Sequence, residues 1–479
     1  MKRTSARTCV IATLGPASDS PERIAELIDA GTNVFRLNFS HGDRDSHAGR
    51  FEAIRKASAE RLKPVGILQD LQGPKIRIGR FDDGSVHLEP GATFILDCDQ
   101  SEPGNAESVG VSYRGLSQDV SRGEELLLDD GRLALEIVEI AGRKIKTRVT
   151  RGGKLGSNKG INLPGSDLRI PALSDKDVED IKLGAELGVD WVAMSFVRSR
   201  DDVFLARHYL ERFGSDARLM AKIEKPSAIA RFDDILDAAD GIMIARGDLG
   251  VELSPEQVPI VQKRLIRACR EAGKPVVTAT QMLESMTGSP IPTRAEASDV
   301  ANAIFDGSDA VMLSAETAVG EYPVAAVEFM NRLALAVESD EAYQRAMQEK
   351  VVQSDQTIAD SVAHAACQMA QEIGAEVIVT FSSSGSTALR VARHRVANAV
   401  LAITPSELAY RQLAMSWGIS AVLAPRDISN SDEMVSEANA WILKSKLGEP
   451  GDNYVITAGV PFGVAGTTNL IRAETVQAI

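Results

Sequence analysis

Residues 218–250 read RLMAKIEKPSAIARFDDILDAADGIMIARGDLG. Two runs in this stretch, Arg218–Glu224 and Gly241–Gly247, are apolar almost without interruption, as strands buried on both faces of a parallel sheet are. Between them, Ser227–Leu236 has the spacing of apolar and polar residues that is typical of an amphipathic helix. The stretch therefore predicts a strand–helix–strand unit with parallel strands.

The same unit recurs on both sides of this stretch. Six further apolar runs are predicted as strands: Thr8–Leu14, Asn33–Ser40, Val65–Leu71, Asp190–Val197, Lys274–Gln281 and Asp309–Glu316. Amphipathic helices are predicted at Pro21–Ala30, Ser174–Leu187 and Glu256–Ala272. Pro21 and Pro255 each follow a serine, a pairing that favours the start of a helix. Eight such units predict a (β/α)₈ TIM barrel, with an open parallel sheet as the alternative on this pattern alone.

The barrel pattern covers residues 1–72 and 171–345 and is interrupted at 73–170. There the helical periodicity gives way to short alternating runs, separated by the turn signals Asp83-Gly84, Asp130-Gly131 and Ala141-Gly142. This segment is predicted to form a small β-barrel domain inserted in a loop of the larger barrel.

Residues 346–479 return to alternating strands and helices. The predicted elements are Ala359–Ile373, Glu376–Phe381, Ala388–Val396, Ala399–Ile403, Ser406–Trp417, Ile419–Leu423 and Asn453–Thr457. This order is typical of a separate, doubly wound α/β domain.

Composition excludes several classes of protein. The 479 residues are 44% apolar and 25% charged, which is typical of a folded globular chain. A net charge of -14 argues against non-specific nucleic-acid binding. The four cysteines are scattered, and neither a signal peptide nor a membrane span is evident, so a cytoplasmic protein without a membrane anchor is expected.

Polar and ionisable residues gather where the predicted strands end, which is the functional face of a barrel of this kind. In chain order they are Arg36, Asn38, Ser40, His41, Asp70, Lys75, Arg77, Ser195, Lys222, Glu224, Arg246, Gly247, Asp248, Thr280, Gln281, Ser314 and Glu316. Their convergence on one rim predicts an active site there.

Glu224 and Asp248 close two neighbouring strands, so their carboxylates can reach one point. Two carboxylates with open positions suit Mg²⁺ or Mn²⁺. Lys222 projects from the same side of its strand as Glu224, and a simple Lys–Glu ion pair is the alternative reading. Gly247 allows the backbone to approach a ligand closely.

Four cations near this rim predict a site for phosphate or carboxylate groups: Arg36, Lys75, Arg77 and Lys222. Taken singly, each could also be an ordinary rim residue in an ion pair. The Gly-rich run at 152–157 lacks the spacing of a P-loop, so a nucleotide would be held in another way. His41 is a possible ligand contact or a surface residue.

Across nearly its whole length the sequence resembles the pyruvate kinase family. The matching stretches are ATLGPAS, FRLNFSHG, DLQGPKIR, LGSNKGINLPG, AMSFVR, KIEKP, IMIARGDLGVEL, TATQMLESM, PTRAEASDVANAI and MLSAETAVGEYP, in an order that fits the predicted strands. The resemblance implies phosphoryl transfer from phosphoenolpyruvate to ADP, giving pyruvate and ATP in the last step of glycolysis.

The resemblance also implies roles for the rim residues. The divalent metal would lie on Glu224 and Asp248, and Lys222 and Arg36 would contact the transferred phosphoryl group. The substrate carboxylate would bind Gly247, Asp248 and Thr280. The enolate would be protonated on the side where Thr280, Ser314 and Glu316 lie. Lys159, in the inserted domain, would close over the nucleotide with help from Arg36 and His41, which makes that domain a lid that excludes water.

Many family members also require potassium, at a site that resembles three side chains of this sequence: Asn38, Ser40 and Asp70. The threonine that usually follows this aspartate is Leu71 here, and Lys75 stands where potassium-requiring members carry glutamate. Because Lys75 can place an ammonium near the position of the potassium charge, the sequence predicts activity without potassium.

The C-terminal segment contains a hydroxyl-rich and glycine-containing loop before a predicted helix: Ser382, Ser383, Ser384, Gly385, Ser386 and Thr387. Such a loop at a helix N-terminus suits phosphate, and it resembles the family's loop for phosphorylated allosteric effectors; a well-capped helix start is the alternative. The run 463–468 would flank the same pocket. The resemblance further implies a homotetramer.

Two other functions fit parts of the pattern. A metal-dependent lyase or aldolase acting on pyruvate enolate would share the paired carboxylates but would need neither the inserted domain nor a nucleotide site. A non-catalytic sugar-phosphate sensor would need only the C-terminal loop. The presence of Lys222, Glu224, Asp248 and Thr280 argues against lost catalysis.

Overall fold

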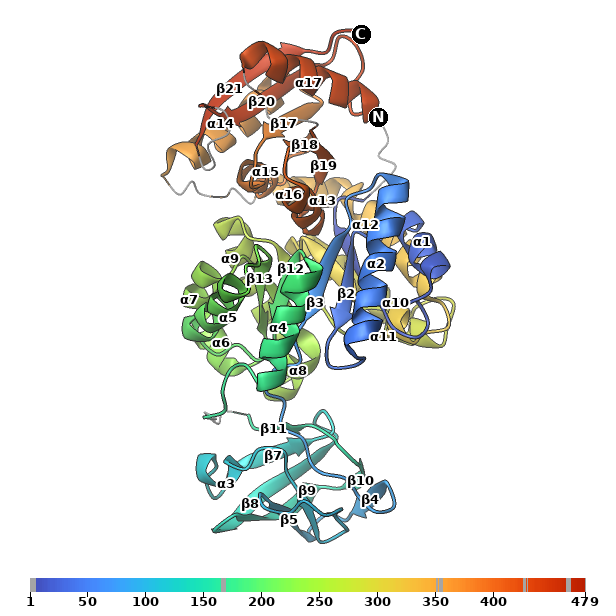
Figure 1. Cartoon of the computed structure of the whole chain (residues 1–479), viewed down its shortest axis with the longest axis vertical. Coiled ribbons are helices and arrows are strands. Elements are labelled where there is room, and N and C mark those ends of the chain that lie inside the picture. The colour runs from blue at the N-terminus through green and yellow to red at the C-terminus, as the bar shows by residue number, and fades with distance from the viewer. Residues whose placement is uncertain are drawn as a thin grey trace.

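Three domains lie in a row along the long axis of the molecule (Figure 1). The computed structural model describes residues 6–164, 169–349, 352, 356–424, 428, 430–461 and 467–478. The barrel occupies the middle, an all-β domain lies at one end, and the C-terminal α/β domain lies at the other. The two ends of the barrel therefore face different domains.

The central domain is a closed barrel of eight parallel strands in the order β1-β16-β15-β14-β13-β12-β3-β2, which confirms the predicted TIM barrel. Its strands are β1 (Cys9–Thr13), β2 (Val34–Asn38), β3 (Gly66–Asp70), β12 (Trp191–Met194), β13 (Arg218–Ile223), β14 (Gly241–Ala245), β15 (Val276–Ala279) and β16 (Ala310–Leu313). Apart from Arg36, Asn38 and Arg218, every residue in these strands is buried, which explains their continuous apolar character.

Helices surround the barrel: α1 (Pro21–Asp29), α2 (Arg44–Arg61), α4 (Asp175–Leu187), α5 (Arg200–Arg212), α6 (Pro226–Ala230), α7 (Phe232–Ala238), α8 (Arg246–Glu252), α9 (Val258–Ala272), η1 (Glu284–Thr287), α10 (Arg294–Asp306), α11 (Ala315–Ala318), α12 (Pro323–Glu338) and α13 (Glu341–Glu349). The predicted cap at Ser20 is confirmed, because its side chain accepts the Arg23 N–H. The predicted helix start at Pro255 is wrong: the Gln257 N–H bonds to the Ser254 carbonyl in a separate turn, and α9 begins afterwards.

The insertion between β3 and α4 consists mainly of β-strands, as predicted, with one short helix. It contains β4 (Ser85–Leu88), β5 (Thr93–Asp97), β6 (Ser108–Gly110), α3 (Leu116–Asp119), β7 (Glu125–Leu128), β8 (Leu133–Ala141), β9 (Lys144–Arg151), β10 (Gly153–Gly156) and β11 (Ile161–Asn162). A six-stranded sheet and the β10–β4 pair enclose a core of their own, which includes Phe94, Leu126 and Ile137.

The C-terminal domain has a sheet in the order β19-β18-β17-β20-β21, the topology of a doubly wound fold. Its elements are α14 (Ile358–Glu372), β17 (Val377–Phe381), α15 (Ser386–Ala392), β18 (Ala399–Thr404), α16 (Glu407–Gln412), η2 (Leu413–Met415), β19 (Ile419–Leu423), α17 (Ser431–Lys444), β20 (Asn453–Gly459) and β21 (Thr468–Thr475). The sequence prediction missed α17 and the antiparallel edge strand β21. Residues 463–466, part of the predicted flanking loop, lie outside the described residues.

A short segment of the C-terminal domain closes the barrel mouth opposite the functional rim. Ala414 and Met415 of η2 belong to the same buried cluster as the residues that fill the barrel lumen, among them Trp191, Met220 and Met243. The Trp191 indole N–H donates to the Gln412 carbonyl at 3.2 Å. The barrel interior is therefore completed by a residue from another domain.

Ala414 and Met415 form a plug in the barrel mouth, and the contribution of this plug to stability can be measured. We expect Met415→Ala to lower the free energy of unfolding by about 2–5 kcal/mol, because a fully buried side chain is replaced by a cavity. Urea denaturation followed by tryptophan fluorescence reports the change, since Trp191 lies in the same cluster. Leu62→Ala, at an 87% exposed position, is the control. Equal effects of the two substitutions would contradict a packed plug.

Candidate active site

A buried lysine lies at the centre of the rim that faces the inserted domain. Lys222 Nζ lies 3.2 Å from Asp70 Oδ1 and 3.0 Å from Glu224 Oε1, and it donates to Ser195 Oγ at 2.6 Å. Arg36 Nε is 2.6 Å from the other oxygen of Asp70. Side chains from β2, β3, β13 and the end of β12 thus meet at one point, as the sequence predicted.

Burial and charge act against each other in this cluster. Burial by itself would raise the pKa of Asp70, but the charges of Lys222 and Arg36 outweigh it and hold that pKa below its usual value. For Lys222, burial lowers the pKa, while the carboxylates of Asp70 and Glu224 raise it above normal. The ammonium therefore stays charged inside the protein, where it can neutralise an anionic group.

Glu224 and Asp248 lie close enough to affect each other. Burial raises the pKa of Glu224, and the neighbouring Asp248 carboxylate raises it further. Such a pair fits a divalent cation, because a cation removes the repulsion between the two carboxylates. Within the described residues, no group of three or more His, Cys, Asp or Glu side chains could hold a metal ion. A cation held by these two carboxylates would keep other positions for water and substrate.

Gly247 and Asp248 lie in the first turn of α8, directly after β14, whereas the sequence predicted that the strand would extend to Gly247. The Gly247 N–H donates to Thr280 Oγ1 at 2.7 Å. Thr280 has a φ of 71°, which is rare for a β-branched residue and costs about 1–3 kcal/mol. Such strain is typical of residues that are held in place for a ligand.

Arg246 maintains this strained turn. One of its nitrogens donates to the Thr280 carbonyl at 2.8 Å, and another lies 2.7 Å from Asp299. The sequence placed Arg246 on the rim but gave it no role. The sequence did not reveal that Arg246 is buried, because a charged residue after a strand gives no indication of the direction of its side chain.

Glu316 holds backbone rather than pointing freely into the site. Its two oxygens accept the N–H groups of Leu283, at 3.0 Å, and Ser314, at 2.6 Å. Burial raises the pKa of Glu316. Glu316 thereby joins the loops after β15 and β16, next to Ser314, on the side of the rim where Thr280 lies.

The residues that were predicted to bind the nucleotide belong to two domains: Lys159 lies in the insertion, as does Arg77, and His41 lies on the barrel. Lys159 Nζ is 2.7 Å from Asp129 Oδ1, and an Arg77 nitrogen donates to the Asn158 carbonyl at 3.1 Å, so both side chains bond within the insertion. His41 is exposed at the end of β2, and its carbonyl accepts a hydrogen bond from His47 Nε2 at 2.9 Å. Within the described residues, no hydrogen bond or ion pair joins the Lys159 side chain to the barrel rim.

The residues expected at the monovalent site are only partly assembled. Asn38 Oδ1 accepts the Ser40 N–H at 3.1 Å, and the Leu71 carbonyl accepts the Ser195 hydroxyl at 2.7 Å. Lys75 Nζ instead lies 3.0 Å from Asp248 Oδ1. Lys75 therefore pairs with a predicted metal ligand rather than with Asp70.

Two residues without a predicted role complete the cluster. Ser195 connects Lys222 to the Leu71 carbonyl through its hydroxyl. The Phe196 N–H donates to Glu224 Oε2 at 2.7 Å, with Phe196 at a φ of 56°. Ser195 ends a predicted strand, which placed it on the rim, but nothing in the sequence indicated its partners.

The predicted effector loop runs from β17 into α15 at the opposite end of the molecule. Gly385 has a φ of 79°, and a side chain there would collide with Leu413 of η2. The hydroxyl of Thr387, at the end of the loop, lies 2.6 Å from the hydroxyl of Thr468 at the start of β21. An Arg218 nitrogen, at the start of β13, donates to the Ser384 carbonyl at 2.7 Å. The loop thus contacts both the plug and a barrel strand.

A closed barrel with a charged lysine, an arginine and a carboxylate pair on its functional rim belongs to the class of barrel enzymes that act on anionic substrates. Comparisons define the class further. Residues 5–327 match the family described as pyruvate kinase, barrel domain, and residues 360–473 match pyruvate kinase, alpha/beta domain.

Curated relatives and a solved structure agree with these matches. A pyruvate kinase of Methylorubrum extorquens is 45% identical over 98% of both chains, and one of Geobacillus stearothermophilus is 43% identical over 100% of this chain and 81% of the relative. The crystal structure of a pyruvate kinase from Cryptosporidium parvum superposes with a TM-score of 0.90 at 35% identity, covering 98% of this chain and 96% of that one. The chain belongs to the pyruvate kinase family and is a phosphotransferase. Among the described residues, no helix has the length and apolar character needed to cross a membrane.

The burial of His47, in α2, predicts how the stability of the protein depends on pH. His47 stacks on Phe39 with ring centroids 3.9 Å apart, and burial lowers its pKa to about 4. The folded protein therefore keeps His47 neutral while the unfolded chain takes up a proton below about pH 6.5, so stability falls as the pH is lowered from 6.5 towards 4. We expect the stability advantage of the wild type over His47→Gln to shrink between pH 7 and 5.

Chemical denaturation across this pH range measures the difference. His208→Gln, at an exposed position, controls for the loss of any histidine. A difference between wild type and His47→Gln that stays constant with pH would show that folding does not lower the pKa of His47.

Proposed function

We propose that the chain transfers the phosphoryl group of phosphoenolpyruvate to ADP with Mg²⁺ or Mn²⁺, without potassium, and under control of a phosphorylated effector. The observation that carries the chemistry is the buried, charged Lys222 between Asp70 and Glu224. Membership of the pyruvate kinase family supplies the substrates.

Positioning and charge neutralisation are the main requirements of phosphoryl transfer. Lys222 and Arg36 would neutralise the equatorial oxygens of the phosphoryl group. The backbone of Gly247 and Asp248, in the first turn of α8, would hold the substrate carboxylate together with Thr280. The Gly247 N–H would then exchange its bond to Thr280 Oγ1 for one to the carboxylate. Glu224 and Asp248 would hold the divalent cation, which supplies Lewis acidity when bound.

Protonation of the enolate would take place on the Thr280 side, where Ser314 and Glu316 lie. Glu316 has both oxygens bonded to backbone N–H groups, so it is better suited to position Ser314 than to carry the proton itself. Lys159, Arg77 and His41 would bind the nucleotide after the inserted domain moves towards the rim, which also excludes water. By analogy with relatives, we propose a cytoplasmic homotetramer.

Independence from potassium rests on Lys75. Its ammonium lies 3.0 Å from Asp248 Oδ1 in this structure. Once Asp248 serves as a metal ligand, Lys75 is free to place its charge towards Asp70, where other family members use potassium. Leu71 supports this proposal, because it offers no side-chain oxygen to a monovalent cation.

Effector control rests on two contacts of the loop Ser382–Thr387. One joins Ser384 to Arg218, and β13 continues from Arg218 to Lys222. The other packs Gly385 against Leu413, two residues before Met415 in the lumen. A phosphate on this loop would therefore act on the strand that carries the catalytic lysine.

Formation of pyruvate and ATP from phosphoenolpyruvate and ADP tests the core of the proposal. We expect Lys222→Met to lower kcat by roughly 10²–10³-fold, the usual effect of removing one group that stabilises transition-state charge. Lys263→Met, on the outer surface of α9, is the matched control. A Lys222→Met enzyme with wild-type kcat would refute the assigned role, and removal of metal with EDTA should abolish the wild-type rate.

The same assay in sodium-free Tris buffer tests potassium independence. The wild type should give equal rates with and without added potassium. Lys75→Glu replaces the ammonium by a carboxylate, and we expect it to make potassium necessary, with at least about tenfold activation, equivalent to about 1.4 kcal/mol. A wild type that works only with potassium would leave the kinase in place and remove the role given to Lys75.

A panel of fructose bisphosphate, hexose and pentose monophosphates and AMP tests effector control. We expect one of these to activate the wild type, and Arg218→Ala to lose most of that activation while its rate without effector stays within about twofold, since no catalytic contact is removed. Arg212→Ala, on the exposed surface of α5, is the control. Full activation of Arg218→Ala would disprove coupling through β13.

A further inference from the structure

The two strands that connect the insertion to the barrel form a ribbon. The Ile161 N–H donates to the Ile76 carbonyl and the Ile78 N–H to the Lys159 carbonyl, both at 2.9 Å. Arg77 is the antiparallel bridge partner of Gly160. This register places Lys75 opposite Asn162, so the two side chains share one side of the ribbon.

Helix α8 presents a matching pair of carboxylates. Asp248 and Glu252 are four residues apart, which places them on one face of the helix. Lys75 Nζ is 3.0 Å from Asp248 Oδ1, and Asn162 Nδ2 donates to Glu252 Oε1 at 3.1 Å. Each connecting strand of the insertion is therefore bound by one side chain to α8, the helix that also carries Gly247.

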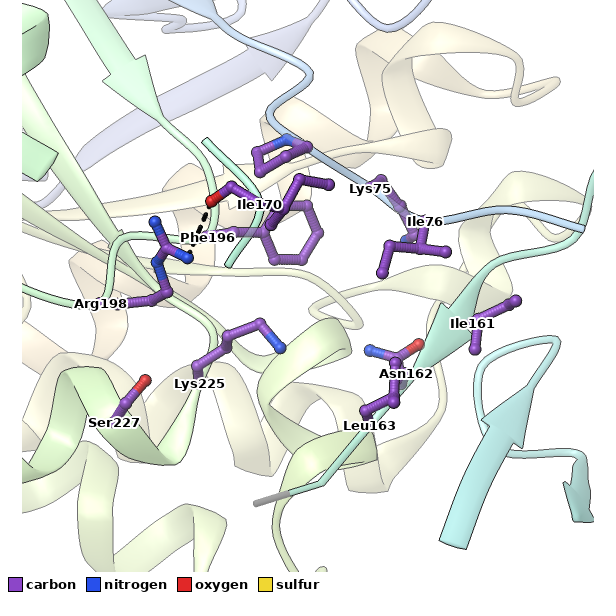
Figure 2. Close-up of a pocket in the computed structure, with 11 residues that line it drawn as sticks. Lys75, Ile76, Ile161, Asn162, Leu163, Ile170, Phe196, Arg198, Lys225 and Ser227 are labelled. Carbon is purple, nitrogen blue, oxygen red and sulfur yellow. Dashed lines mark hydrogen bonds between the residues drawn. The ribbon is translucent and has the colours of Figure 1, made fainter. Parts of the chain in front are cut away.

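Lys225 adds a third group to the Glu252 junction. Its Nζ is 3.2 Å from the same Glu252 oxygen, and Figure 2 shows the Lys225 and Asn162 side chains pointing towards one another across a pocket. Lys225 directly follows Glu224 in the chain. The position of the insertion is thus linked to both segments that carry the predicted metal ligands.

Stability alone is a weak reason for this arrangement. Glu252 and Asn162 are 6% and 5% exposed, and a buried Lys–Glu pair adds little net stability because desolvation offsets the attraction. Within the described residues, Glu252 Oε2 and Asn162 Oδ1 are buried acceptors without a hydrogen-bond partner, which costs further free energy. A feature that contributes little to folding and joins a lid to an active-site helix points to a role in positioning.

We propose that Glu252 is the pivot of the inserted domain: Asn162 and Lys225 hold it, and this junction sets where the domain comes to rest over Asp248. The Lys75–Asp248 contact is released when Asp248 takes up its role in the site, while the Asn162–Glu252 contact keeps the ribbon attached to α8. Asn162, Lys225 and Glu252 are positioning residues. This inference rests on the lid role given to the insertion under the proposed function.

A lid held in the wrong place admits water to the phosphoryl group. Water then attacks phosphorus, the bond to the enolate oxygen breaks, and the enolate takes up a proton, so that pyruvate and inorganic phosphate form without ATP. The ratio of ATP to pyruvate therefore reports the position of the lid, and general destabilisation of the protein would leave this ratio at one.

Asn162→Asp places a carboxylate against Glu252 and should repel it. We expect kcat/KM for ADP to fall by about 10²-fold, as for a misplacement of about 1 Å, and the ATP-to-pyruvate ratio to fall below one. The double variant Asn162→Asp/Glu252→Gln reverses the donor and acceptor and restores one N–H···O bond. It should recover kcat/KM to within about tenfold of wild type and return the ratio to one.

Two results overturn the proposal: wild-type kcat/KM and product ratio in Asn162→Asp, or a double variant no better than the single one. If Asn162→Asp does not fold, the variant Glu252→Gln, which keeps the side-chain shape, provides a second test of the pivot. Amide hydrogen exchange of residues 75–79 and 160–163 should be faster in Glu252→Gln than in the wild type, and unchanged exchange overturns the pivot. Asn105→Ala, in an exposed turn of the insertion, is the control. A wild type that makes no ATP from phosphoenolpyruvate would instead refute the kinase proposal.

Discussion

A lysine ammonium remains charged inside a protein only when carboxylates lie beside it. Lys222 meets this condition because the closed barrel brings Asp70 of β3 to one side of it, far away in the sequence, while Glu224 follows directly after β13 on the other side. Neither carboxylate would be stable there without the lysine and Arg36, since uncompensated burial of a charge costs several kcal/mol. The site and the barrel therefore depend on one another: the rim holds its charges because the strands close, and the charges fix the order of side chains at the rim.

Helix α8 connects this charge balance to the rest of the molecule. Its first turn carries Gly247 and Asp248 next to the strained Thr280, and its last turn carries Glu252, which contacts the insertion. A seven-residue helix thus joins the substrate end of the rim to the domain that would cover it. On the opposite side, β13 runs from Arg218, which contacts the C-terminal loop, to the residues at the rim. The two outer domains reach the site through neighbouring strand–helix units.

The sequence predicted the barrel, the β-rich insertion and the rim residues because each depends on a local pattern: apolar runs, turn dipeptides and the residue at a strand end. It did not predict the antiparallel strand β21 or the turn before α9, where alternation is weak or a serine–proline pair lies one turn early. It also could not assign partners. Lys75 was expected near Asp70 but bonds to Asp248, and nothing marked Glu252 or Asn162, because side-chain direction is decided by tertiary packing.

The C-terminal domain begins near residue 346 by sequence, yet one of the barrel's own core residues is Met415. The covalent boundary and the packing boundary therefore differ. A hybrid enzyme assembled by joining this barrel to the C-terminal domain of a relative would receive a foreign side chain in its lumen, against Trp191, Met220 and Met243. Exchange of regulatory domains between family members thus requires that residues lining the lumen be exchanged along with them.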